Sequence, residues 1–423
     1  MPRATAWRLK LALYTLGAAL LAAGVAVAQP AKAPGPATSG ESIPVAIDAQ
    51  ISGDTTAGRI QFTLSAPVTP RVTVLDKPDR LVIDLPEVNF QVPPDVGRKP
   101  RGLVKSVRWG LIGPGRSRIV VELAQPALPG RLVAEPVLGG AAATLTLELR
   151  KADRDAYTRA TTVAAPAAVA DPVQPLRGDR RPLVVLDPGH GGIDTGAIGL
   201  SRILEKDVVF AFAKALKDKL ERTGQVRVLL TRDGDSFVAL NDRVRLARSA
   251  NASLFVSIHA DTLTVSPEVR GLTVYTNSDR ASDAEAARLA ESENRADSLA
   301  GVESTEDGEE IAGILSDLTR RETRTYSHLF ARSLVGQITA ASRLNKNPHR
   351  SAGFRVLRAP DVPSVLVELG YLSSKSDVEL LTAADWRDRT TDSITTAITG
   401  FLGPRMAQQA QAPLPPARPE QAP

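Results

Sequence analysis

The chain has 423 residues, which is enough for two or three domains of ordinary size. Its 43% of apolar residues can fill real cores, but 4% of aromatic residues is little for a protein that stacks on nucleic-acid bases. There is no cysteine, which excludes disulfides, thiolate zinc sites, iron–sulfur clusters and a cysteine nucleophile. Any metal must therefore be held by histidines and carboxylates.

The amino terminus has the pattern of an export signal. Three basic residues, Arg3, Arg8 and Lys10, precede a charge-free apolar run that ends in small residues at Ala28. We predict that residues 1–28 are a cleaved signal peptide, so the membrane is met only during export. Cleavage lowers the net charge from +5 to +2 (5 − 3), and no nucleic-acid partner is expected. The alternative is an uncleaved anchor, because 18 apolar residues just suffice to span a membrane.

Composition divides the rest of the chain into folded and linking segments. The prediction is two folded domains on flexible tethers. In chain order the segments are a linker at 29–42, a strand-rich domain at 43–150, an Ala/Pro/Arg-rich linker at 151–181, a domain of alternating strands and helices at 182–402, and a disordered tail at 403–423.

The first domain has period-2 apolar patterns and no helical periodicity, which predicts a small all-β sandwich. The expected strands are 59–64, 71–75, 80–85, 118–123 and 142–149. No cluster of His, Asp or Glu has the spacing of a catalytic site, so a binding role is favoured over chemistry.

A basic segment lies inside this domain. Residues 98–118 contain seven basic residues and no acidic one. A sugar polymer or an anionic polymer would suit this segment, whose candidate contacts are Arg101, Lys105, Arg108 and Trp109. The alternative is a solvated basic face with a core tryptophan. The run Lys77-Pro-Asp-Arg-Leu-Val-Ile-Asp-Leu85 resembles the signature strand of AMIN domains, which implies a module that targets the cell wall.

The second domain carries two histidines at the ends of buried strands. The apolar run 182–187 leads to Pro188-Gly-His190-Gly-Gly, and the run 254–258 leads to His259. In open α/β sheets the carboxyl edge of parallel strands forms the binding crevice, so both histidines are expected there.

Glu205 starts the helix predicted to follow the first of these strands. By position alone it could simply be a favourable charge at the helix amino terminus. Together with the two histidines it forms a plausible His-Glu-His set of zinc ligands, which leaves a fourth position for water.

Four motifs occur in order over residues 182–402: Asp187-Pro-Gly-His-Gly-Gly-x-Asp-x-Gly196, Glu205, Ser257-Ile-His-Ala-Asp261 and Val365-Leu-Val-Glu-Leu-Gly-Tyr-Leu-Ser373. This set resembles the zinc-dependent N-acetylmuramoyl-L-alanine amidases of the amidase-3 family. The resemblance implies an open, mostly parallel twisted sheet flanked by helices. It also implies one zinc ion held by His190, Glu205 and His259, with Glu368 as the catalytic carboxylate.

Glu368 ends a buried strand pattern, where a carboxylate is costly unless it has a partner or a task. If this strand is parallel to the others, Glu368 reaches the same crevice and can take and return a proton during amide hydrolysis. The competing interpretation is that Glu368 only pairs with an arginine such as Arg355. The two remaining histidines, His328 and His349, match no metal-binding position of the motifs.

Residues 279–322 interrupt the rhythm of strands and helices, with thirteen acidic and five basic residues. Helical patterns cover 284–290 and 311–318. An insertion of this length is usually a functional lid or a disordered loop. In the amidases that the chain resembles, this region covers the zinc cleft until a LytM-type activator displaces it. We therefore predict autoinhibition, with an acidic residue near Glu293 as a temporary zinc ligand; the alternative is a solvated acidic loop.

The sequence thus predicts a periplasmic zinc amidase that acts on peptidoglycan during daughter-cell separation, is enriched at the division site and depends on an activator. The bond cleaved would join the lactyl group of N-acetylmuramic acid to L-alanine of the stem peptide. Two alternatives stay open at this point. One is a zinc peptidase that cuts within stem peptides, and the other is a wall-binding scaffold without activity.

Overall fold

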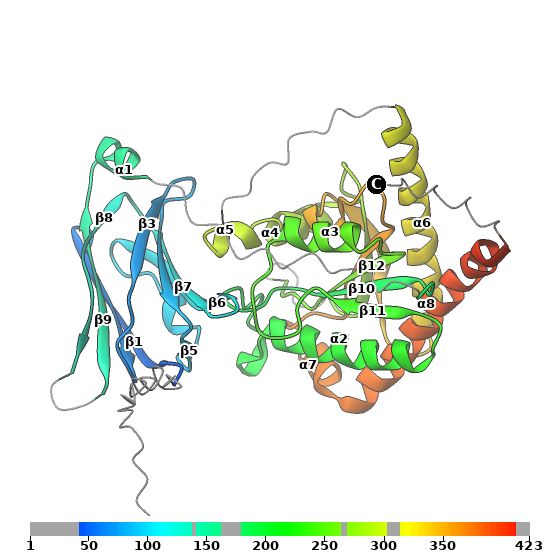
Figure 1. Ribbon diagram of the computed structural model, residues 1–423, viewed down its shortest axis with the longest axis horizontal. Helices are drawn as coiled ribbons and strands as arrows, with labels where there is room; N and C mark the ends of the chain where they lie inside the picture. Colours follow the sequence, from blue (N-terminus) through cyan, green and yellow to red (C-terminus); the bar gives the residue numbers. More distant parts are fainter. Residues whose placement is uncertain (1–41, 138–140, 162–178, 264–268, 303–313, 412–423) are drawn as a thin grey trace, which may run out of the picture. The chain divides into compact units, whose positions relative to one another are not determined.

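The computed structural model describes residues 42–137, 141–161, 179–263, 269–302 and 314–411 (Figure 1). Residues Ile43–Pro423 form one compact unit. The predicted signal peptide lies outside the described residues, as do nearly all of the predicted 29–42 linker and most of the linker at 151–181. Among the helices described, none combines the length and apolarity needed to cross a membrane.

The amino-terminal region is a sandwich of two antiparallel sheets, as predicted. The first sheet has the order β5-β1-β2-β9-β8 and the second the order β3-β4-β7-β6. The first consists of β1 (Val45–Gly53), β2 (Ala57–Leu64), β5 (Asn89–Phe90), β8 (Ala127–Pro136) and β9 (Ala143–Lys151); the second of β3 (Arg71–Leu75), β4 (Arg80–Pro86), β6 (Val104–Gly113) and β7 (Arg116–Leu123), with a 3₁₀ turn η1 (Val96–Arg98) before β6.

Alternation along the strands builds the sandwich core. In β9, for example, Leu145, Leu147 and Leu149 are buried while the residues between them are half-buried. Such alternation places one face of each sheet against the other. The predicted strands of this region all form.

Four strands were not predicted, namely β1, β5, β6 and β8, and for two of them the sequence shows why. β6 and β8 lie at sheet edges and carry Gly or Pro, which are depleted in strands and weaken the pattern.

The predicted start of the second linker at residue 151 also needs correction. Helix α1 (Arg154–Ala160) follows β9, and Tyr157 is fully buried in the sandwich core, where its hydroxyl donates to the carbonyl of Leu75.

The second region is built on a six-stranded sheet of order β11-β10-β12-β15-β13-β14. All neighbours are parallel except β13 and β15, which confirms the predicted open, mostly parallel α/β sheet. The strands are β10 (Leu183–Pro188), β11 (Arg227–Leu230), β12 (Leu254–His259), β13 (Leu272–Asn277), β14 (Leu344–Ala352) and β15 (Ser364–Glu368).

Helices cover both faces of this sheet (Figure 1). One face packs on α2, α6 and α8, and the opposite face on α3 and α4. The bounds are α2 (Glu205–Arg222), α3 (Leu240–Ser249), α4 (Ala284–Glu293), α5 (Ala296–Leu299), α6 (Ile314–Ile338), α7 (Lys375–Thr382) and α8 (Ala384–Gln411), with 3₁₀ turns η2 (Leu200–Arg202) and η3 (Arg355–Leu357).

The parallel strands determine where the site forms. β10, β12 and β15 are neighbours, and His259 pairs in register with Glu368. The carboxyl ends of the three strands therefore meet at one edge of the sheet, as expected for a site in an open α/β fold.

One predicted boundary differs from the structure, and one further strand was not predicted. The predicted tail begins at residue 403, but α8 continues to Gln411. Residues 344–352 form edge strand β14, which the polar sequence Asn-Lys-Asn-Pro-His-Arg-Ser does not indicate. Residues 412–423 lie outside the described part.

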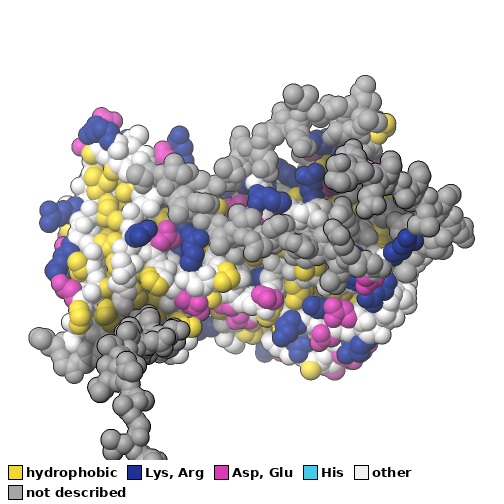
Figure 2. All heavy atoms as spheres, in the orientation of Figure 1, with side chains coloured by type: hydrophobic (Ala, Val, Ile, Leu, Met, Phe, Trp, Pro, Cys, Tyr) yellow, Lys and Arg dark blue, Asp and Glu magenta, His cyan; other side chains and the backbone are white. Residues whose placement is uncertain are grey.

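The surface carries charges of both signs. On the face in view, basic and acidic side chains are interspersed over the described residues (Figure 2).

Candidate metal centre and active site

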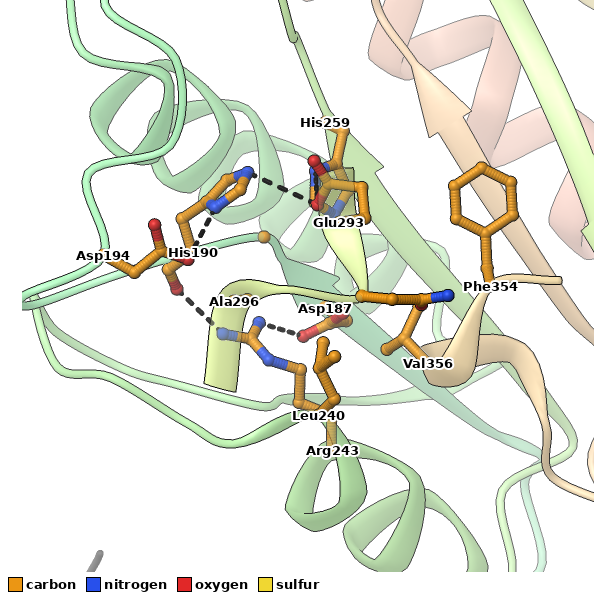
Figure 3. A pocket seen from close by; sticks show the side chains of 12 residues that line it. Asp187, His190, Asp194, Leu240, Arg243, His259, Glu293, Ala296, Phe354 and Val356 are labelled. Carbon is orange, nitrogen blue, oxygen red and sulfur yellow. Dashed lines mark hydrogen bonds and ion pairs between the residues drawn. The ribbon is translucent and has the colours of Figure 1, made fainter. Parts of the chain in front are cut away.

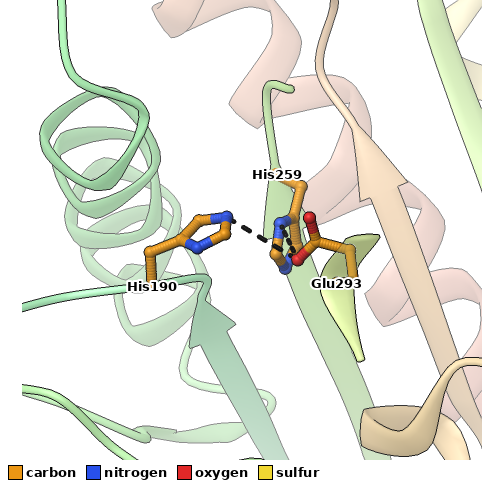
Figure 4. Close-up of side chains that lie close together, drawn as sticks. All are labelled: His190, His259 and Glu293. Atoms are coloured by element: carbon orange, nitrogen blue, oxygen red, sulfur yellow. Dashed lines mark ion pairs between the residues drawn. The ribbon is translucent and has the colours of Figure 1, made fainter. Parts of the chain in front are cut away.

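Four side chains from separate elements converge at the carboxyl edge of the sheet. They are His190 just after β10, Glu205 at the start of α2, His259 at the end of β12 and Glu293 at the end of α4. Glu205 Oε1 lies 3.1 Å from His190 Nε2 and 3.2 Å from His259 Nδ1. Glu293 Oε2 lies 3.6 Å and 3.2 Å from the same two nitrogens. The two histidines and Glu293 could hold a metal ion (Figure 4).

Glycines of the first motif make room for these side chains. A Cβ on Gly189 would lie 2.4 Å from the ring of His259. A Cβ on Gly196, whose φ is +63°, would lie 2.7 Å from both Glu205 and His190. Only glycine allows such close approach at these positions, and the left-handed φ of Gly196 also favours it. The spacing of the motif is therefore explained by the packing of the site.

Acidic and basic neighbours orient His190. Asp194 Oδ2 lies 2.8 Å from His190 Nδ1, which leaves Nε2 directed at Glu205 and Glu293. Arg243 donates to the carbonyl of His190 at 2.9 Å, which stabilises its left-handed backbone with φ of 58°. A ligating histidine held through its other nitrogen is the usual arrangement in metal sites.

Asp187 connects this arrangement to the sheet. It accepts from Arg243, Thr231 and Ser257 at 2.6–2.7 Å, and all four side chains are buried. Burial alone favours the neutral acid, but Arg243 and the hydrogen bonds hold the pKa of Asp187 below its usual value. Sequence reasoning did not identify Arg243, because nothing in the helical pattern distinguishes a buried arginine from an exposed one.

Glu368 is fully buried at the end of β15. One carboxylate oxygen accepts from the amide of Asp261 at 3.1 Å, and the other has no hydrogen-bond partner among the described residues. Burial, with the charges of Glu205, Asp261 and Glu293, raises the pKa of Glu368 well above its usual value. No ion pair joins Glu368 to an arginine in the described part of the chain, so the pairing alternative has no support there.

The insertion closes over this edge of the sheet. A small pocket beside the two histidines is lined by Glu293, Asn294 and Ala296 from the insertion, opposite Phe354 and Val356 (Figure 3). Asn294 donates to the carbonyl of Gly353 and accepts from the amide of Arg355, both at 2.8 Å. We call residues 284–301 the lid.

The four wall-binding candidates do not form one exposed patch. Trp109 is 7% exposed and packs edge-to-face on Phe62 with ring centroids 5.3 Å apart. Arg101 and Lys105 are exposed, and Lys105 pairs with Glu122 at 2.6 Å. Arg108 is half-buried. Trp109 is therefore a core residue, as the alternative of a solvated basic face with a core tryptophan stated. A role of the four candidates in wall binding stays a prediction.

The other two histidines lie on α6 and β14. Their rings are 5.4 Å apart and both approach the hydroxyl of Thr276. Burial and nearby arginine charge lower the pKa of His328, and burial lowers that of His349. Neither belongs to the cluster around His190.

Comparison with known proteins identifies both regions. A family model described as N-acetylmuramoyl-L-alanine amidase matches residues 184–400, more than half of the chain. The chain belongs to this amidase family. A model of the AMIN domain matches residues 46–134. Both resemblances seen in the motifs are thereby confirmed, and the two regions are called the amidase domain and the AMIN domain below.

Named relatives agree with the family models. N-acetylmuramoyl-L-alanine amidase AmiC of Neisseria meningitidis serogroup B is 34% identical over 348 residues, which cover 78% of this chain and 83% of that protein. N-acetylmuramoyl-L-alanine amidase AmiA of Escherichia coli K12 is 40% identical over 221 residues, covering 52% and 76% respectively. The solved structure of AmiC2 of Nostoc punctiforme is 31% identical, covers 53% of this chain and 99% of its own, and has a TM-score of 0.36.

Proposed function

We propose that the chain is a zinc-dependent N-acetylmuramoyl-L-alanine amidase of the cell wall. It would hydrolyse the amide between the lactyl group of N-acetylmuramic acid and L-alanine of the stem peptide. The observation that carries the proposal is the convergence of His190, Glu205 and His259, with Glu368 on the neighbouring strand.

The donor atoms fit zinc. Tetrahedral zinc with bonds of about 2.0–2.1 Å separates its ligand atoms by about 3.3 Å. The measured separations of 3.1, 3.2, 3.2 and 3.6 Å lie close to this value. Two imidazoles and a carboxylate are also a ligand set that zinc prefers in hydrolases. His190 Nε2 is buried and faces Glu205 and Glu293, yet it makes no hydrogen bond of normal geometry among the described residues, as a metal-facing nitrogen would.

The chain's own residues supply the rest of the chemistry. Bound zinc supplies a polarised carbonyl and a water of lowered pKa. With zinc held by His190, Glu205 and His259, the carboxylate of Glu368 would take up a proton from the attacking water and return it to the leaving nitrogen. Its position suits this task, because Glu368 ends β15 in register with His259 on the neighbouring strand and is buried at the same edge of the sheet.

Glu293 gives the lid an inhibitory role. Its carboxylate lies where it would be a fourth ligand beside His190 and His259, the position that water needs for hydrolysis. The enzyme is then inactive until the lid moves. An activator of the LytM type, implied by the family resemblance, would shift the equilibrium by binding the open state better.

The export signal predicted from the sequence would place this activity in the periplasm. Peptidoglycan is then the substrate within reach, and the AMIN domain would keep the enzyme on the wall near the division site. Neither role requires a nucleic-acid partner.

Release of dye-labelled fragments from purified peptidoglycan tests the proposal. We expect little release by the mature protein, strong release by Glu293→Ala, and none by Glu293→Ala after chelation of zinc. Glu291→Ala is the matched control, because Glu291 is an exposed residue of the same helix. Failure of Glu293→Ala to release more than Glu291→Ala, with zinc bound and the fold intact, would refute inhibition by Glu293. Chelator-resistant release would refute zinc catalysis.

A further inference from the structure

The carboxyl end of the lid is held by the AMIN domain. Arg118 of β7 donates from Nη1 to the carbonyls of Ala300 and Gly301 at 3.3 and 3.0 Å. Arg80 of β4 donates to the carbonyl of Ser298 at 2.6 Å. These carbonyls belong to the last turn of α5 and the two residues after it, where a helix leaves acceptors unsatisfied.

The arginines are built into the sandwich, which makes them firm anchors. The side chain of Arg118 is fully buried and forms a two-pronged pair with Asp84 at 2.7 and 3.2 Å. Arg80 is 4% exposed and also donates to the carbonyl of Pro78. A guanidinium already ordered in this way loses little conformational entropy when it binds the lid.

Apolar contacts accompany these hydrogen bonds. A small core joins Val82 and Val120 of the AMIN domain to Ala300 and to Phe237 and Ile193 of the amidase domain. Gly301, with φ of +67°, lies directly on the valines, because a Cβ there would be 2.7 Å from Val82 Cγ2. The lid end therefore binds the sheet of β4 and β7 both through its backbone and through its small side chains.

The contact between the lid end and the AMIN domain lies close to Glu293 along the chain. Glu293 is only seven residues before Ala300, and α5 between them is a rigid turn of helix. An end fixed by buried arginines limits how far Glu293 can withdraw from the histidines.

We propose that the AMIN domain is an inhibitory clamp on the lid, in addition to its role in targeting. The clamp consists of Arg80, Arg118, Val82 and Val120. The clamp must break before the metal site can open. A ligand that competes with the lid for the sheet of β4 and β7 therefore favours the active state. The proposal rests on the inhibitory role of Glu293.

Hydrogen exchange of residues 284–300 in the full-length mature protein tests the clamp without depending on activity. Gly301→Ala introduces the overlap with Val82 on the lid side and leaves the AMIN core unchanged. Gly224→Ala is the matched control, because Gly224 has the same φ of +67° but no atom within 4 Å of an added Cβ. We expect at least tenfold faster exchange of the lid in Gly301→Ala and no change in Gly224→Ala.

A second pair of variants probes the clamp from the AMIN side. Arg80→Ala should accelerate lid exchange, whereas Arg59→Ala should not, since Arg59 pairs with Glu148 away from the lid. Both accelerating variants should also raise basal peptidoglycan hydrolysis. Lid exchange that stays at the control level in Gly301→Ala and Arg80→Ala would overturn the clamp. If instead Glu293→Ala fails to raise hydrolysis, the inhibitory role of Glu293 is what fails.

Discussion

Replacing Gly189 by alanine should damage metal binding through a single methyl group. The added Cβ would lie 2.4 Å from Cε1 and 2.5 Å from Nε2 of His259, while ordinary contact begins at 3.4 Å. The imidazole must therefore shift by about 1 Å (3.4 − 2.4). Metal sites tolerate departures of only about 0.2 Å in their ligand distances. Because the backbone at Gly189 has no positive φ, the effect is steric and not conformational.

The expected loss can be bounded. Removing a hydrogen-bond partner of a ligand costs about 10–100-fold in metal affinity, and displacing the ligand itself should cost at least as much. We therefore expect zinc affinity to fall at least tenfold, which corresponds to about 1.4 kcal/mol. The measurement is competition for zinc with a chromophoric chelator, with thermal unfolding of the metal-free protein as a check on the fold.

Gly234→Ala serves as the control, because Gly234 has no atom within 4 Å of an added Cβ and no positive φ. It should bind zinc like the unmodified protein. If Gly189→Ala is folded and binds zinc within about twofold of Gly234→Ala, the packing of His259 on Gly189 is not what positions this ligand.

Three further predictions concern other parts of the molecule. Glu368→Gln in the Glu293→Ala background should lower peptidoglycan hydrolysis by about 10²–10⁴-fold while zinc content stays at one per chain, because only the proton transfer is lost; hydrolysis above a tenth of the parent rate would contradict this role. Asp194→Ala frees Nδ1 of His190 and should weaken zinc binding about 10–100-fold in the chelator competition, whereas Asp233→Ala, at an exposed aspartate of the same domain, should not. Trp109→Ala should lower the free energy of unfolding of the AMIN domain by about 3–5 kcal/mol in denaturant titrations, since the ring is in the core; a folded variant of unchanged stability that no longer binds wall would favour a direct contact instead.

The parts of the fold that the sequence predicts are those with strong periodicity. The runs 183–187 and 254–258 are mostly apolar and predict buried strands, and a histidine follows each run within three residues, so the chain itself places it at the strand end. Edge strands such as β8 and β14 are held by their neighbours and not by their own sequence, so they could not be recognised.

The site follows the same division. That His190, Glu205, His259 and Glu368 lie at one edge of the sheet could be predicted because their motifs and strand ends are local. Arg243 and Arg118 act across distances of 53 and 183 residues, on His190 and Gly301 respectively. No local pattern reports such contacts, and only the folded chain brings these groups together.

The mass of the peptides released from purified peptidoglycan by Glu293→Ala tests the central claim most directly. The account predicts intact stem peptides with a free amino-terminal L-alanine, glycan strands that keep an unmodified lactyl carboxylate, and loss of both products on zinc chelation. Peptides cut within the stem would show a peptidase and contradict the account, and an undigested wall in the presence of bound zinc would contradict any hydrolysis of this substrate.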